Sequence, residues 1–269
     1  MARLSSFRDV IEELFYNDIF NALSEYVENN PDKLDSNSYC VESPDEATLS
    51  GIEVKFVNIT DSEDNGILFD VVVSAEIEVA ETVRRNREID GLEQWFRISC
   101  SAELDDGLKQ FYISGIHIYN KYQNIKKNSR SEYLVPIISK EQLDDVAEIF
   151  LEKYYPEALA EPRAVPTREV AKRMGLEIQE AHITKNCTVF GQIYFSDCEI
   201  QCYDIDAGAY KPLAIKRGTI LVDPSVYFMR TVGSMNNTII HECVHWDLHK
   251  KFFELEKLYN KDARSISCQ

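Results

Sequence analysis

His241-Glu242-Cys243-Val244-His245 is the most informative stretch in the second half of this 269-residue chain. On an α-helix, residues four apart lie on the same face, about one turn from each other. The two histidine side chains can therefore reach one zinc ion. Glu242 is offset by about 100° from His241, so its carboxylate lies toward the open side of the metal and does not bind it. There it can take a proton from water, which is how a metallopeptidase is arranged.

The residues around this stretch predict a long helix. Gly233 supplies a turn, and Ser234 is a candidate N-cap. We therefore expect the helix to run from about residue 235 to about residue 259. An apolar stripe with three-to-four spacing supports it: Ile239, Ile240, Cys243, Val244, Leu248, Phe252 and Leu255. The apolar pair directly before His241 suggests a buried site, whereas the alternative interpretation is a helix with surface histidines and a surface glutamate.

The first half of the chain changes its hydrophobic period near residue 50. Over residues 6–28, apolar side chains recur with the spacing of an amphipathic helix. Over residues 52–119, apolar and polar side chains alternate in about four segments, which is the pattern of half-buried antiparallel strands. We therefore expect an N-terminal helix packed on an antiparallel β meander.

A polar and basic segment at residues 120–137 is the best candidate for a domain boundary. It separates an expected N-terminal α+β domain, residues 1–130, from a second domain, residues 138–269, so the expected fold class of the chain is α+β. The elements expected in the second domain are a capping box and helix from Ser139, a short helix between an N-cap at Thr167 and Gly175, and strands over residues 188–195, 199–205 and 219–222.

The net charge of the chain is −17, from 46 acidic and 29 basic residues. Proteins that bind DNA or RNA gain much of their affinity by neutralising phosphates with basic side chains, so direct nucleic-acid binding is not expected. The same argument speaks against an anionic membrane surface. No apolar run approaches the roughly 18 residues that span a bilayer, and the charged N-terminus differs from a signal peptide. We therefore expect a cytoplasmic protein.

The seven cysteines favour free thiols in a reducing compartment, because their number is odd and they contain no Cys-x-x-Cys pair. Cys198 and Cys202 are four residues apart, so on a strand they would share one face. A second metal site at this pair is the alternative to simple burial.

A longer pattern surrounds the two histidines, over about residues 163–255. Its parts are Val-Ala-Lys-Arg-Met-Gly-Leu-Glu-Ile at 170–178, Phe-Gly-Gln-Ile at 190–193, Gly-Thr-Ile-Leu-Val-Asp at 218–223, and Ile-Ile-His-Glu-Cys-Val-His-Trp-Asp-Leu-His at 239–249. In this order they resemble the ImmA/IrrE family of metallo-endopeptidases. The resemblance implies a zincin-like domain in which His241 and His245 bind zinc and Glu242 is the general base. It also implies a bacterial or mobile-element protein that cleaves a helix-turn-helix transcriptional repressor.

Two features depart from the pattern of this family. The family often has Leu-Gly between the glutamate and the second histidine, where this chain has Cys243-Val244. On a helix the Cys243 thiol points away from the metal, so we expect it in the core. The family's third ligand is a glutamate on a later helix, whereas this chain stops at Gln269, 24 residues after His245.

Three nearby residues are poor substitutes for that third ligand. His249 continues the face of the two histidines, but it lies about 12 Å along the helix axis from His241. Glu254 falls on the opposite face, and Glu256 lies more than about 15 Å up the helix. The third ligand is therefore expected beyond Gln269, or in a segment of the chain that the pattern does not place.

The expected function is a zinc-dependent endopeptidase that acts on a protein substrate. The alternative is a non-catalytic regulatory or protein-binding module whose peptidase site is degenerate or incomplete. Residues 1–130 match no family pattern, and neither the oligomeric state nor an activating signal follows from the sequence.

Overall fold

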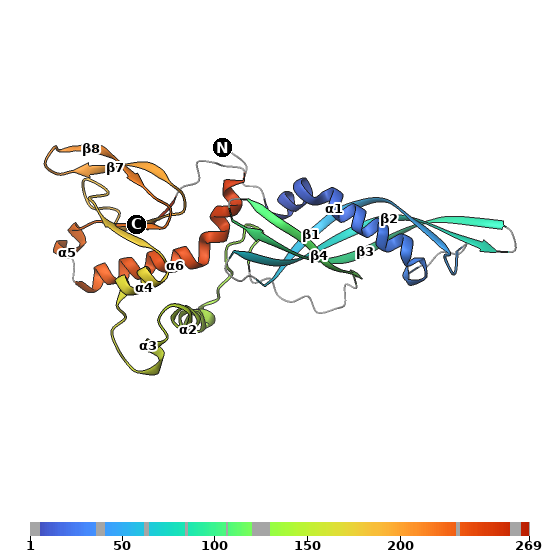
Figure 1. Ribbon diagram of the computed structural model, residues 1–269, viewed down its shortest axis with the longest axis horizontal. Coiled ribbons are helices and arrows are strands. Elements are labelled where there is room, and N and C mark those ends of the chain that lie inside the picture. The colour runs from blue at the N-terminus through green and yellow to red at the C-terminus, as the bar shows by residue number, and fades with distance from the viewer. Residues whose placement is uncertain are drawn as a thin grey trace. The chain divides into compact units, whose positions relative to one another are not determined.

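The computed structural model describes residues 6–35, 41–61, 65–83, 86–105, 107–119, 130–229, 232–258 and 265–268. The chain divides into two compact units, residues 1–137 and residues 138–269 (Figure 1). Both units combine helices with strands, so the expected α+β class is confirmed. Within the described ranges, no helix has both the length and the apolar character that crossing a membrane requires.

The first unit is a long helix packed on a four-stranded antiparallel sheet, as expected (Figure 1). Helix α1 begins at a capping box, in which Ser6 Oγ accepts from the Asp9 N–H and the Asp9 carboxylate accepts from the Ser6 N–H. The strands are neighbours in the order in which they follow along the chain. The elements are α1 Phe7–Asn29, the 3-10 turn η1 Pro31–Lys33, β1 Glu46–Asp61, β2 Gly66–Val83, β3 Asn86–Leu104 and β4 Leu108–Ile118.

Alternation along the strands creates the core under α1. Burial of β3 alternates from Gln94 to Leu104, because successive side chains point to opposite faces. Ring contacts join the helix to the buried face of the sheet: Phe7 meets Phe69 edge-on at 5.0 Å, and Tyr26 meets Phe96 edge-on at 6.0 Å. These contacts explain why the helix and the meander form one unit.

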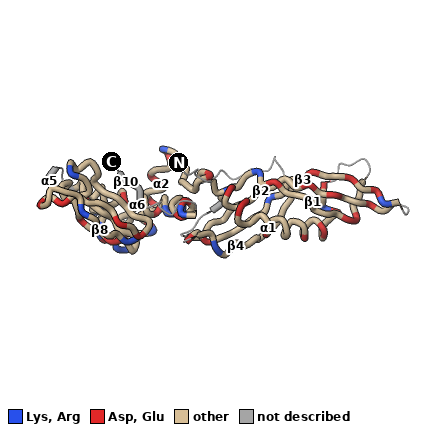
Figure 2. The backbone as a smooth tube through the Cα atoms, turned by 90° about the horizontal axis from the view of Figure 1, so that it is seen from above, with Lys and Arg blue, Asp and Glu red and all other residues tan. Residues whose placement is uncertain are grey.

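The first unit also carries most of the negative charge of the chain. Residues 1–137 contain 26 Asp and Glu residues against 13 Lys and Arg residues, from totals of 46 and 29. Figure 2 shows the acidic residues spread along the strands of this unit and along α1. Some of these carboxylates lie on neighbouring strands, where repulsion between them would lower the stability of the sheet.

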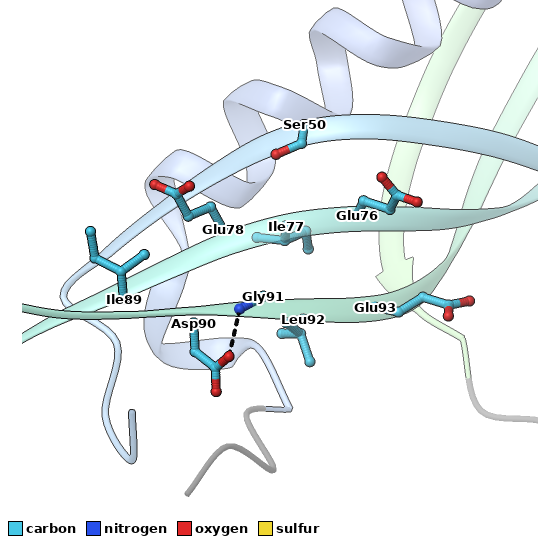
Figure 3. Close-up of a pocket in the computed structure, with 9 residues that line it drawn as sticks. All are labelled: Ser50, Glu76, Ile77, Glu78, Ile89, Asp90, Gly91, Leu92 and Glu93. Carbon is cyan, nitrogen blue, oxygen red and sulfur yellow. Dashed lines mark hydrogen bonds between the residues drawn. The ribbon is translucent and has the colours of Figure 1, made fainter. Parts of the chain in front are cut away.

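A hollow of about 560 Å³ in the first unit is lined by residues of β1, β2 and β3. Figure 3 shows Glu76 and Glu78 of β2 and Glu93 of β3 among its lining residues. Glu76 and Glu93 are directly opposite each other in the β2–β3 register, whereas Glu78 is opposite Gly91. Like charges that face each other across a strand pair destabilise a sheet.

Replacing Glu76 by glutamine should therefore stabilise the first unit. We expect Glu76→Gln to raise its free energy of unfolding by roughly 0.2–1 kcal/mol, measured by urea unfolding at low salt. Glu78→Gln is the matched control, since it removes the same charge from a position opposite glycine. An equal gain in both variants would show that net charge, and not the opposed pair, is responsible.

The second unit is built on a small mixed sheet with strand order β10-β6-β9-β5. Strands β5 and β9 are parallel, and β6 is antiparallel to both β9 and β10. Its helices are α2 Leu143–Tyr154, α3 Glu157–Ala160, α4 Thr167–Arg173, α5 Ser225–Met229 and α6 Val232–Lys257, with the 3-10 turn η2 Lys140–Gln142. Its strands are β5 Glu177–Glu180, β6 Gly191–Tyr194, β7 Cys198–Asp204, β8 Ala209–Ile215, β9 Thr219–Val222 and β10 Ser265–Cys268.

Two apolar clusters lie on the two faces of this sheet. The larger cluster joins α6 to β6 and β9, and Phe195, which follows β6, stacks on Phe253 of α6 with ring centroids 4.1 Å apart. The smaller cluster joins Tyr194 and Leu221 to the β7–β8 hairpin. The long helix and the hairpin therefore cover opposite faces of the sheet.

Several expected boundaries in the second unit are corrected by the structure. Helix α6 begins at Val232, so Ser234 lies inside the helix and is not its N-cap. Thr167 is the first residue of α4 and Pro166 occupies the cap position. The capping box at Ser139 and the left-handed conformation of Gly175, with φ +73°, are confirmed.

Candidate functional site

Helix α6 carries the three residues that the sequence singled out. Its buried face includes Met235, Ile239 and Cys243, which belong to the larger apolar cluster. Cys243 is fully buried, as expected, and burial raises the pKa of its thiol to about 12. Packing of this face fixes the rotation of the helix, and with it the direction in which the neighbouring histidines project.

His241 and His245 come together on α6. Their Nε2 atoms are 3.0 Å apart, and their ring centroids are 4.5 Å apart. Two nitrogens at this separation can both lie about 2.0–2.1 Å from a single zinc ion, so the pair fits the metal. His241 is exposed and His245 is partly buried. The expectation of a buried site is therefore wrong for His241, because the apolar residues before it face the sheet and turn this ring outward.

His249 extends the row of rings by one more helical turn. Its Nδ1 atom is 3.0 Å from Nδ1 of His245, on the side of that ring opposite to the His241 contact. If a metal were bound at the two Nε2 atoms, His245 would carry its proton on Nδ1. That N–H could then donate a hydrogen bond to Nδ1 of His249. His249 is thus placed to orient His245.

Glu242 lies on the inner side of α6, against the first residue of β6. Its side chain is 0% exposed. A Cβ atom added to Gly191 would lie 3.4 Å from Glu242 Oε1 and 2.4 Å from Thr238 Cγ2. Gly191 therefore permits a close approach of strand and helix, and a larger residue at this position would force one of them to shift. Sequence reasoning missed this role, although a glycine that opens a strand is a signal for such an approach.

Glu254, one of the residues weighed as a third metal ligand, is engaged elsewhere. Glu254 is 1% exposed, and its carboxylate accepts hydrogen bonds from Arg217 and Lys257, each at 3.0 Å. Over the described part of the chain, no group of three or more His, Cys, Asp or Glu residues could hold a metal ion. The source of a third ligand stays a prediction.

Cys198 and Cys202 lie on β7, as the spacing suggested. Both pack in or against the smaller apolar cluster, and burial is the main cause that raises the pKa of the Cys202 thiol. Packing in apolar surroundings therefore explains these two cysteines without a metal site.

A second polar group, around Asp223, is structural. The Asp223 carboxylate is fully buried and accepts from the backbone N–H groups of Ile183 and Ser225, both at 2.9 Å. His182 Nδ1 lies 3.2 Å from Asp223 Oδ1 and 3.1 Å from Ser225 Oγ. A catalytic triad needs its acid and its nucleophile at opposite nitrogens of the ring, which these contacts do not provide. Instead, the hydrogen bonds of Asp223 connect the segment after β5 to the turn after β9.

Comparisons with known proteins add little to this geometry. No family model matches the chain, and no curated protein matches it. Among solved structures, one similar chain is described as an Ntf2 like protein involved in plasmid conjugation. The two share 9% identity over 66% of this chain and 76% of that chain, with a TM-score of 0.19. A likeness at that level carries no argument about fold or function.

The close packing of β6 on α6 at Gly191 can be tested by substitution. We expect Gly191→Ala to destabilise the second unit by about 1–3 kcal/mol, because its Cβ would overlap Thr238 Cγ2. Adding Thr238→Ser removes that methyl group and should restore part of the loss in chemical unfolding. Failure of the second substitution to restore stability would contradict the close contact between β6 and α6.

The surroundings of the His245 ring should make the stability of the metal-free chain depend on pH. Burial, and then the His241 and His249 rings, lower the pKa of His245 to about 4, from an ordinary value of about 6.5. Between these values the unfolded chain binds more protons, so stability should fall as the pH falls from about 6.5 to about 4. His245→Gln should make this dependence weaker when unfolding is followed in the presence of a chelator. An unchanged dependence would contradict the assignment.

Proposed function

We propose that the second unit is a zinc-dependent endopeptidase module that acts on a protein substrate. The observation that supports it most directly is the 3.0 Å separation of the His241 and His245 Nε2 atoms, with Glu242 between them in sequence on the same helix. The resemblance of residues 163–255 to metallo-endopeptidases supports the same conclusion from the sequence. A helix-turn-helix repressor is the first candidate substrate, on the strength of that resemblance.

Each residue of this site has a separate role in the proposal. His241 and His245 would hold zinc, and His249 would orient the His245 ring through its Nδ1 atom. When bound, zinc would polarise the carbonyl of the scissile peptide and make water more acidic. Glu242 would accept a proton from the attacking water and deliver it to the departing amine. Its burial beside β6 limits contact between this carboxylate and bulk water.

The first test separates zinc binding from peptide hydrolysis. Glu242→Gln should retain zinc and lose hydrolysis by at least about 100-fold, because it removes the proton acceptor and leaves both ligands. His241→Ala should lose both properties. Zinc is measured by metal analysis after reconstitution at neutral pH, and hydrolysis with a candidate repressor. Undiminished cleavage by Glu242→Gln would refute the proposal, and a chain that takes up no zinc would favour the non-catalytic binding module.

A second test concerns His249. Loss of a residue that orients a ligand typically weakens metal binding by about 10–100-fold, and we expect this for His249→Ala. His249→Asn is the matched control, because its side-chain oxygen can still accept a hydrogen bond from His245. Zinc affinity is measured by competition with a chelator. Equal affinity in the unmodified chain and His249→Ala would contradict the orienting role.

A further inference from the structure

The outer edge of β6 is occupied by a segment of the same chain that is distant in sequence. Strand β10 pairs with β6 in antiparallel register, from Ser265 opposite Tyr194 to Cys268 opposite Gly191. Within the described part of the chain, β10 is the end strand of this sheet and pairs with β6 alone. Four residues held on one side by main-chain pairing form a small contact that another extended segment can replace.

This edge runs beside the candidate site. The first residue of β6, Gly191, lies against Thr238 and Glu242 of α6. Beyond the other end of β6, Phe195 stacks on Trp246 of α6 with ring centroids 5.2 Å apart. The strand therefore follows the part of the helix that carries both histidines. A residue paired opposite Gly191 is one strand spacing, about 4.8 Å, from the backbone that contacts Glu242.

We infer that the outer edge of β6 is a binding site for an extended peptide, which the chain fills with its own β10. The ligand is a peptide main chain in antiparallel orientation, recognised by the backbone N–H and C=O groups of β6. The inference rests on the proposed function only in treating Glu242, which lies beside this edge, as a catalytic residue. Strand β10 then competes with substrate for the same edge.

Proline substitutions test the occupancy of the edge in the full chain. Neighbouring residues of a strand direct their N–H groups to opposite sides, so one of Ile266→Pro and Ser267→Pro removes a hydrogen bond to β6. Ile266→Val and Ser267→Thr keep the N–H and serve as matched controls. The probe is a fluorescein-labelled peptide with the sequence of residues 261–269 and the substitution Cys268→Ser, which prevents disulfide formation.

Fluorescence anisotropy measures binding of this probe to each chain. If β10 occupies the edge for about nine-tenths of the time, its complete release should tighten binding about tenfold in one or both proline variants. The controls should bind like the unmodified chain. Equal affinity in all chains, or no binding by any, would overturn the inference. Loss of the fold in the proline variants, seen by circular dichroism, would overturn it too, because β10 would then not be a replaceable occupant.

Hydrolysis of a fluorogenic peptide distinguishes this inference from the proposed function. Faster hydrolysis by the proline variants would support both. Tighter probe binding with no hydrolysis by any chain would support the peptide-binding edge and contradict the peptidase proposal. Hydrolysis that is the same in all chains, with unchanged probe binding, would support the peptidase and overturn the role of β10.

Discussion

The close approach of α6 to β6 at Gly191 is the constraint on which the second unit depends. A Cβ atom at this position would lie 2.4 Å from Thr238 Cγ2, so a residue larger than glycine would push the strand and the helix apart or displace the Thr238 side chain. Stacking of Phe195 on Phe253 fixes the distant part of the same helix. Held at both positions, α6 cannot rotate without losing buried contacts, and the directions of its side chains are therefore set.

That fixed rotation separates the two kinds of side chain in the candidate site. The histidines project from the side of α6 that water reaches, and their Nε2 atoms are 3.0 Å apart. Glu242, one residue along from His241, is directed inward and is fully buried. Residues four apart on a helix share a face, whereas adjacent residues point about 100° apart. The helix alone therefore separates the two histidines from Glu242, without any contribution from loops. The chemistry we propose also needs the Glu242 carboxylate to reach the water at the metal. The expectation that this carboxylate lies toward the open side did not anticipate a fully buried side chain.

Much of the fold could be predicted from the sequence, because its signals were local. Expected as residues 6–28, α1 is observed as Phe7–Asn29, since apolar periodicity and a capping box mark its limits. Strand β8 was missed because Pro212 and its polar neighbours hide a strand that pairs with β7 alone. The role of Gly191 depends on a helix much later in the chain, so a glycine at the start of a strand can signal a close approach but not the helix that it meets. The row of histidines and the burial of Cys243 followed from helical spacing alone.

The proposed function requires that His241 and His245 bind one zinc ion through imidazole nitrogen. X-ray absorption at the zinc edge of the reconstituted full chain reports these ligands. We expect two imidazole ligands with Zn–N distances of about 2.0–2.1 Å, both lost in the variant that combines His241→Ala with His245→Ala. A first shell with sulfur at about 2.3 Å, or a spectrum that this double substitution leaves unchanged, would contradict it.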